Sequence, residues 1–181
     1  NYNNVPGLIN NETNYAKTAT GGLGLVLSSN ISEKFDFSIF FQGVARTSFF
    51  INPENIAPFV LNGPYQNNLL DVVAQDHWSE NNRDLYAFWP RLSNTFVENN
   101  NQVSTWWMRN GAFLRLKSIE LGYNAPDEFI SKIGVKGLRI YFSGNNLAVW
   151  SKFKLWDPEM GGSGLGYPIQ SVYNLGLKVD F

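Results

Sequence analysis

Five stretches of the sequence alternate hydrophobic and polar residues with a period of two, which is the pattern of β-strands with two unlike faces. These stretches cover residues 21–29, 34–46, 112–123, 137–147 and 171–181. In the last stretch the hydrophobic positions are Tyr173, Leu175, Leu177, Val179 and Phe181. The positions between them are polar or glycine, so the pattern predicts an all-β fold whose last strand has one apolar face.

Two local features predict how the strands pair. Only the tetrapeptide NISE, residues 30–33, separates the first two stretches, which favours a tight hairpin. In the third stretch Leu114 and Leu116 share one phase of the alternation, whereas Ile119 and Leu121 share the other. This change of phase predicts a β-bulge near residues 117–118.

The connections between the predicted strands alternate between short and long. A short helix is expected from Pro126 to Gly134, because a proline and two acids begin it and a glycine ends it. The long connections cover about residues 48–111 and 148–170. Within the first, residues 69–78 have helical spacing and predict a helix that packs on the core of its own loop.

The composition narrows the class of protein. Only 16% of the residues are charged, against about 25% in typical soluble domains, and aromatic residues reach 15%. The net charge of -1 leaves no basic stripe for nucleic acid, and the absence of cysteine excludes disulfides and thiolate metal sites. Since the chain has neither an initial methionine nor a signal-peptide core, we expect it to be part of a longer protein.

Alternating short and long connections are typical of outer-membrane β-barrels, in which strands of about 9–11 residues join short periplasmic turns to long extracellular loops. In such barrels the final strand runs inward and ends at the periplasmic face. Counting back from residues 171–181 then puts both long connections outside the cell. It also puts the hairpin at residues 30–33 and the turn at residues 126–134 on the periplasmic side.

Five sequence blocks resemble, in order and spacing, the C-terminal end of SusC/RagA-type TonB-dependent outer-membrane transporters. The blocks are FDFSIFFQGV, FWPRLSN, RNGAFLRLKSIELGYNAP, GLRIYFSGNNLAVWSKFKLWDPE and YPIQSVYNLGLKVDF. The resemblance extends from about Gly21 to Phe181. One departure is Gln170, where the family more often has a basic residue.

The resemblance implies that residues 21–181 form the C-terminal five or so antiparallel strands of a transmembrane barrel of about 22 strands, plugged by an N-terminal domain. Residues 1–20 would then end the preceding extracellular loop. The whole protein would import oligosaccharides or peptides across the outer membrane of a Gram-negative bacterium. A SusD-like surface lipoprotein would be its partner, and TonB would energise it through the absent N-terminal part.

The apolar stripe of the last strand is expected to face membrane lipid, with Phe181 in the aromatic girdle at the interface. By resemblance, the same stripe, formed by Tyr173, Leu175, Leu177, Val179 and Phe181, is the signal that the barrel-assembly machinery recognises. The alternative is an amphipathic edge strand in a soluble β-sandwich.

Tryptophans in the predicted loops are candidate contacts for a ligand or for the lipoprotein. These candidates are Trp78, Trp89, Trp150 and Trp156. Their indole faces suit sugar rings, but tryptophans also fill loop cores, form the outer girdle and pack against partner proteins.

Catalytic and metal chemistry find little support in the sequence. Asp157 and Glu159 supply too few oxygens for a hard cation, and His77, the only histidine, is expected to be packed. We therefore expect no enzyme activity, no metal and no cofactor. Two other functions stay open: a soluble β-rich carbohydrate-binding module, and a porin-like channel without plug or lipoprotein.

Overall fold

The computed structural model describes residues 21–59, 61–62, 65–66, 69–164 and 166–181. The expected loop at residues 1–20 lies outside them. The described chain divides into two compact units. The sheet unit contains residues 21–47, 111–158 and 167–181, and the loop unit contains residues 48–110 and 159–166.

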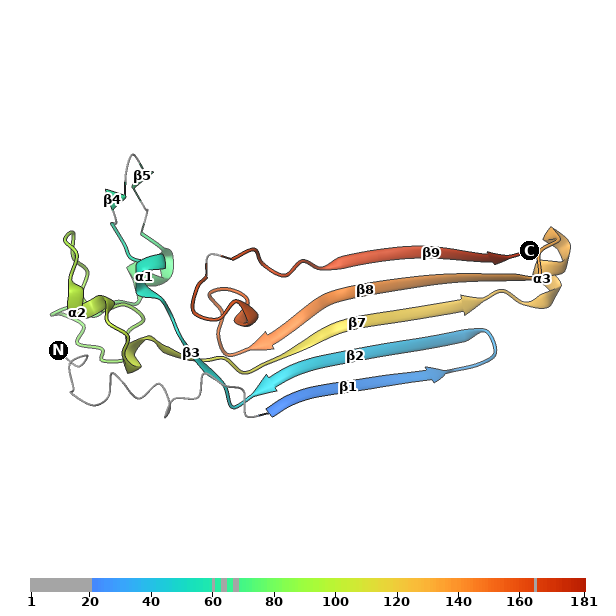
Figure 1. Ribbon diagram of the computed structural model, residues 1–181, viewed down its shortest axis with the longest axis horizontal. Helices are drawn as coiled ribbons and strands as arrows, with labels where there is room; N and C mark the ends of the chain where they lie inside the picture. Colours follow the sequence, from blue (N-terminus) through green and yellow to red (C-terminus); the bar gives the residue numbers. More distant parts are fainter. Residues whose placement is uncertain (1–20, 60, 63–64, 67–68, 165) are drawn as a thin grey trace. The chain divides into compact units, whose positions relative to one another are not determined.

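The sheet unit is built on one antiparallel sheet of five strands in the order β1-β2-β7-β8-β9 (Figure 1). The strands are β1 Gly21–Asn30, β2 Phe35–Ala45, β7 Phe113–Asn124, β8 Gly137–Ser151 and β9 Val172–Asp180. Each strand pairs with the next strand of this sheet along the chain. The predicted all-β class and the five predicted strands are confirmed.

The hairpin and the bulge also form where the sequence predicts them. β1 and β2 pair from Asn30 opposite Asp36, and the Ile31 amide donates to the Phe35 carbonyl at 2.9 Å. The pairing of β7 shifts register between Leu116 and Ser118, so Lys117 is the bulged residue. On β8 the same irregularity includes Asn146, whose φ of 53° is left-handed.

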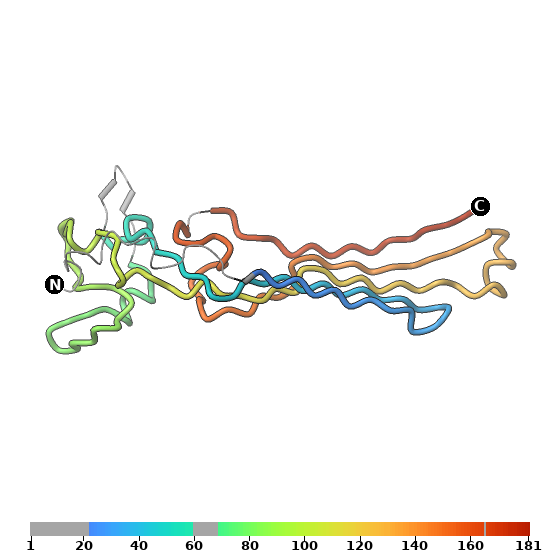
Figure 2. The backbone as a smooth tube through the Cα atoms, turned by 60° about the horizontal axis from the view of Figure 1, so that its bottom comes forward, coloured from blue at the N-terminus to red at the C-terminus, as the bar shows by residue number. Residues whose placement is uncertain are grey.

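The helix α3, Asp127–Ile133, joins β7 to β8 at the end of the sheet where β9 finishes (Figures 1 and 2). Asp127 and Glu128 lie in its first turn and Lys132 in its last, in agreement with the helix dipole. Gly134 ends it with a left-handed φ of 72°, a conformation that costs glycine little. The predicted helix at residues 126–134 is therefore confirmed.

The loop unit contains short elements. Strand β3 Ser48–Phe50 pairs with β6 Met108–Asn110, and β4 Leu61–Asn62 pairs with β5 Tyr65–Gln66. The helices are α1 Asp71–Gln75 and α2 Glu98–Asn101, and 3-10 turns form at Pro53–Asn55, Thr105–Trp107 and Pro158–Met160. Among the described residues, no helix has the length and apolar character needed to cross a membrane.

The helix expected at residues 69–78 is shorter than predicted, since α1 stops at Gln75. The Trp78 amide donates to the Trp89 carbonyl at 2.9 Å, and the Trp89 amide donates to the Asp76 carbonyl at 3.0 Å. These backbone bonds to a distant segment replace the continuation of the helix, because tertiary pairing overrides helical spacing.

The core of the loop unit is largely apolar. Ile51, Val73 and Trp107 are fully buried, and Trp89 packs edge-on against Trp107 with 5.0 Å between ring centroids. The indole nitrogen of Trp107 donates to the Asn100 carbonyl at 3.0 Å, which satisfies its one polar atom.

Candidate functional site

One face of the five-stranded sheet is apolar across every strand. Directly paired residues of neighbouring strands lie on the same face, and the pairing joins Phe37, Leu121, Phe142 and Leu175 into one row across β2, β7, β8 and β9. We call this side the apolar face. Its large apolar side chains are Leu23, Leu25, Leu27, Phe35, Phe37, Ile39, Phe41, Leu114, Leu116, Ile119, Leu121, Tyr123, Leu138, Ile140, Phe142, Trp150, Tyr173, Leu175, Leu177 and Val179.

Many side chains of the apolar face are exposed. Leu25 has 46% of its surface exposed, Leu121 has 48% and Leu175 has 79%. Large apolar surfaces that remain exposed mark interfaces with membranes or partners. Within the sheet unit there is no second sheet to cover this one.

The stripe predicted on the last strand belongs to this face. Tyr173, Leu175 and Leu177 are largely exposed, and Val179 pairs with Leu138 on the apolar face of β8. Phe181 follows the last residue of β9 and is 85% exposed. The structure thus brings the stripe together with the apolar residues of four other strands; its contact with lipid and its role in assembly stay predictions.

The opposite side, the polar face, has large side chains that lie over glycines. Asp36, Gly122, Tyr141 and Gly176 are paired in one row across β2, β7, β8 and β9, which we call the glycine row. A Cβ atom on Gly122 would collide with the Asp36 carboxylate, and one on Gly176 would collide with the Tyr141 ring. Each large residue therefore fills the space that its glycine neighbour leaves.

An ion-pair cluster forms beside the glycine row. Nη2 of Arg139 lies 2.6 Å from Oδ2 of Asp36 and 2.9 Å from Oε1 of Glu120, so one guanidinium links β8 to β7 and β2. The same guanidinium lies 5.4 Å from the centre of the Tyr141 ring. These contacts join three strands through polar side chains on the face opposite the apolar one.

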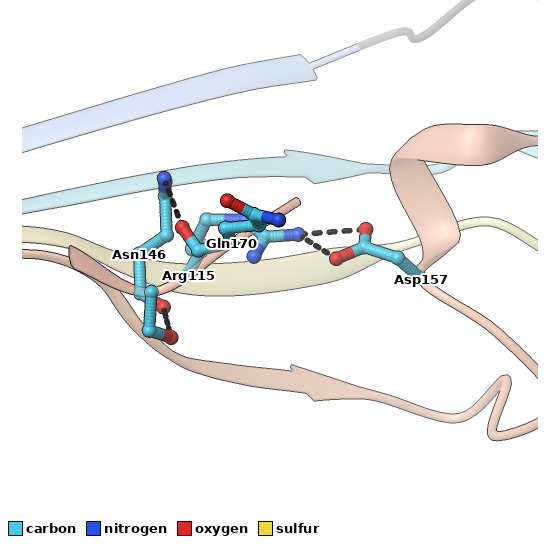
Figure 3. A network of polar contacts seen from close by, with 5 residues as sticks. Arg115, Asn146, Asp157 and Gln170 are labelled. Atoms are coloured by element: carbon cyan, nitrogen blue, oxygen red, sulfur yellow. Dashed lines mark hydrogen bonds and ion pairs between the residues drawn. The ribbon is translucent and has the colours of Figure 1, made fainter. Parts of the chain in front are cut away.

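A buried ion pair holds the segment that follows β8 (Figure 3). Nη2 of Arg115, on β7, donates to both carboxylate oxygens of Asp157 at 2.7 and 2.6 Å. The two side chains are only 3% and 11% exposed. Asp157, considered from sequence as a cation ligand, is thus the partner of a strand arginine. Arg115 lies in the sequence LRLK and Asp157 in the sequence DPE. Because the two residues are 42 positions apart in the chain, no local sequence pattern predicts that they pair.

The other end of that segment is tied to the bulge in β8 (Figure 3). The Asn146 side-chain amide donates to the Gln170 carbonyl at 3.1 Å, and the Ser171 hydroxyl donates to the Asn146 carbonyl at 2.6 Å. Both ends of the connection from β8 to β9 are therefore fixed to the sheet by polar contacts. Asn146 can make these bonds because asparagine tolerates the left-handed backbone.

The loop unit contains an open pocket of about 940 Å³, within the range of small-molecule sites. Trp78 and Trp106 line it together with Arg83 and Arg91. Deeper in the loop unit, Arg109 donates to the Trp106 carbonyl at 2.7 Å. Burial lowers the pKa of Arg109, while the charge of Asp76 opposes that effect.

The four candidate tryptophans occupy different environments. Trp78 lines the open pocket, whereas Trp89 is only 4% exposed and belongs to the core. Trp156 packs edge-on against Phe153 at 4.9 Å. Trp150 lies within β8, opposite Leu114 and near Phe41, so its assignment to the loop at residues 148–170 is corrected: β8 continues to Ser151 because its pairing with β7 continues.

Sequence reasoning gave no candidate role to Arg83 or Arg91, which line the pocket with Trp78. Trp106, a loop tryptophan with the same general suitability for sugar rings, lines it as well. His77 is half-buried, and its Nδ1 lies 3.1 Å from the Val73 carbonyl, in agreement with a packed histidine. No group of three or more His, Cys, Asp or Glu side chains suited to a metal ion occurs among the residues that the structure describes.

Comparison with known proteins identifies relatives by sequence. No family model matches the chain. It is 36% identical to TonB-dependent receptor P26 of Formosa agariphila over 88 residues, which are 41% of this chain and 9% of the receptor. It is 24% identical to TonB-dependent receptor P3 of the same organism over 163 residues, which are 82% of this chain and 15% of the receptor.

Solved structures agree in fold. The RagAB peptide importer in its closed-closed state matches with a TM-score of 0.65 and 24% identity, over 88% of this chain and 17% of that chain. The open-open state matches with a TM-score of 0.63 and 24% identity, over 91% and 18%. The chain thus spans less than a fifth of each of these relatives. They are named as receptors and importers, so the prediction that the chain is not an enzyme is confirmed.

Proposed function

Because these matches confirm the resemblance of the chain to a segment of SusC/RagA-type TonB-dependent transporters, we propose that it forms part of the wall and outer loops of an outer-membrane importer. Strands β1, β2, β7, β8 and β9 cross the membrane, and α3 lies on the periplasmic side. The segments between β2 and β7 and between β8 and β9 lie outside the cell.

The observation that carries this proposal is the two-sided sheet. The apolar face continues over all five strands and stays exposed, while the polar face carries the Arg139 ion-pair cluster and the glycine row. A barrel wall needs this division, with apolar side chains toward lipid and polar side chains toward the lumen. A charged cluster on the lipid side would be costly, whereas the lumen tolerates it.

The energy source, the partner and the substrate belong to the same proposal. We expect TonB to drive import through a part of the protein outside this chain and a SusD-like surface lipoprotein to bind over the outer loops. The barrel-assembly machinery would insert the wall into the outer membrane of a Gram-negative cell. RagAB is a peptide importer, and the substrate class here is a peptide or an oligosaccharide.

A soluble carbohydrate-binding module is the competing function. Such a module would bury its apolar stripes between two sheets. The single sheet of the sheet unit, with its apolar side chains exposed, favours the membrane wall instead. A porin-like channel would have the same kind of wall. The presence of a plug domain upstream of this chain would distinguish a TonB-dependent importer from such a channel.

The test is the size and location of the native polypeptide, measured by peptide mass spectrometry of outer-membrane and soluble fractions from the source cells. We expect peptides of this chain in an outer-membrane band several times larger than 20.5 kDa that co-purifies with a lipoprotein. A free 20.5 kDa species in the soluble fraction would instead establish the soluble module.

A further inference from the structure

The open pocket of the loop unit has two cations in its lining, and the acid that pairs with one of them, Glu80, lies outside the lining. Its described lining residues include the guanidinium groups of Arg83 and Arg91 and no aspartate or glutamate. With a volume of about 940 Å³, it is large enough for a ligand of several rings. A ligand with negative charge would therefore be electrostatically complementary to it.

The guanidinium groups of Arg83 and Arg91 can exchange their present contacts with Glu80 for contacts with a ligand anion. Nη2 of Arg91 lies 3.3 Å from Oε1 of Glu80, but the two side chains are 68% and 71% exposed. Ion pairs this exposed contribute little to stability, so a ligand carboxylate or sulfate can replace the glutamate at small cost. Arg83 donates from Nε to the Glu80 carbonyl at 3.4 Å, a bond that leaves its two terminal nitrogens for other acceptors.

Hydrogen bonds hold the backbones of the two tryptophans whose indole rings line the pocket. The Trp78 amide donates to the Trp89 carbonyl at 2.9 Å, and the Trp106 carbonyl accepts from half-buried Arg109 at 2.7 Å. Indole offers a flat apolar face over which the C–H groups of a sugar ring can lie. The carboxamides of Asn94 and Asn100 add donors and acceptors suited to sugar hydroxyls.

The backbone around the pocket argues against an extended peptide as the ligand. Peptides that bind in extended form commonly add a strand to an exposed sheet edge. None of the described residues that line this pocket belongs to a strand; they lie in coil, in α2 or in the turn Thr105–Trp107. The pocket thus offers side-chain groups and ring faces rather than a strand edge.

We infer that this pocket binds an anionic saccharide, with Arg83 and Arg91 holding its carboxylate or sulfate groups and Trp78 and Trp106 stacking on its rings. The inference rests on the proposed function, since it names the class of substrate that the outer loops of the importer select.

The experiment measures binding to the intact transporter in detergent by calorimetry. The probes are a tetrasaccharide of uronic acids, a sulfated tetrasaccharide, a neutral glucose tetrasaccharide and an acidic tetrapeptide. We expect at least one anionic saccharide to bind more tightly than the neutral one and to weaken as salt rises. Arg83→Gln and Arg91→Gln should each raise its Kd on the order of tenfold, because each removes a charge-assisted hydrogen bond.

The matched control is Lys154→Gln, which removes an exposed loop cation outside the pocket lining and should leave the Kd unchanged. Trp78→Ala should weaken binding of the anionic saccharide without abolishing its salt dependence. The inference is overturned if no anionic saccharide binds, if the arginine variants bind like the control, or if the acidic tetrapeptide shows the arginine dependence instead. Outer-membrane location of the intact protein is measured separately, so failure here is distinguishable from failure of the proposed function.

Discussion

At Gly122 the polar face has room for one ion pair and for no additional side-chain atom. The Asp36 carboxylate and the Arg139 guanidinium occupy the space in which a Cβ atom would stand. Gly24, also on the polar face but on β1, has a different environment, since the nearest atom to its Cβ position is a Phe40 ring carbon at 3.7 Å.

Gly122→Ala should therefore destabilise the intact protein by about 1–3 kcal/mol, the usual cost of forcing atoms into a filled site. The added methyl group must displace Asp36 or Arg139 and thus weaken the ion-pair cluster. The measurement is the denaturant midpoint in lipid vesicles, with Gly24→Ala as the matched control. Equal midpoints for the two variants would show that the Asp36–Arg139 pair does not depend on the glycine.

The Arg115–Asp157 pair should behave differently from exposed pairs, because both of its members are almost fully buried. Arg115→Met leaves a buried carboxylate without its cation and should cost about 3–5 kcal/mol of unfolding free energy. The double variant Arg115→Met, Asp157→Leu should recover most of that loss, since apolar replacement of both partners removes the uncompensated charge.

Arg91→Gln is the comparison for an exposed pair, and its loss of the Glu80 contact should cost less than about 1 kcal/mol. All variants are measured by denaturant unfolding of the intact protein. If the double variant were as unstable as Arg115→Met, packing of the arginine rather than charge pairing would explain the effect.

At the scale of the element, β9 offers neighbouring positions on opposite faces of one strand. Leu175 pairs with Phe142 on the apolar face, and Asn174 pairs with Ser143 on the polar face. The two positions share the same depth along the strand and differ in what the proposed barrel would place beside them.

Leu175→Arg should reduce stability in the membrane by about 2–4 kcal/mol if the position lies near the middle of the bilayer, whereas Asn174→Arg should be tolerated. Folding titrations into lipid vesicles measure both variants. Tolerance of arginine at position 175 together with damage at position 174 would reverse the assignment of the two faces.

Most elements of the sheet unit could be predicted because their signals are local. The alternation from Phe35 to Phe41, the four-residue link at residues 30–33 and the phase change at Lys117 each follow from neighbouring residues. The pairing of Arg115 with Asp157 could not be predicted, since it depends on which turn of a later segment meets the strand. α1 was overestimated for the same reason: a distant strand-like pairing with Trp89 ends it.

The pocket shows the same limit more strongly. Its tryptophans were visible in the sequence as a class, but only the fold separates Trp78, in the pocket, from Trp89, in the core. The cations that accompany Trp78 come from residues that have no spacing pattern of their own. Their grouping follows from the path of an irregular chain, which hydrophobic periodicity does not encode.

At the scale of the whole molecule, Phe181 is expected to act in the assembly of the proposed barrel. Phe181→Ala in the intact protein should lower its amount in the outer membrane more than it lowers import per assembled molecule, because the terminal aromatic is expected to act in assembly rather than in transport. Surface labelling measures the amount, and uptake normalised to that amount measures transport. Normal surface levels would contradict the expectation.

The glycine row disfavours incorrect pairing registers between the strands of the sheet. A slip of two residues between neighbours keeps every hydrophobic residue on its proper side, so the alternating pattern alone cannot exclude it. Such a slip would put Asp36 opposite Glu120 or Asn124 instead of Gly122, and Tyr141 opposite Asn174 or Lys178 instead of Gly176. Asp36 and Tyr141 would then each lie opposite another large side chain, and in one register the Asp36 carboxylate would lie opposite the like-charged Glu120. In the native alignment each of these large side chains lies opposite a glycine, which leaves room for it.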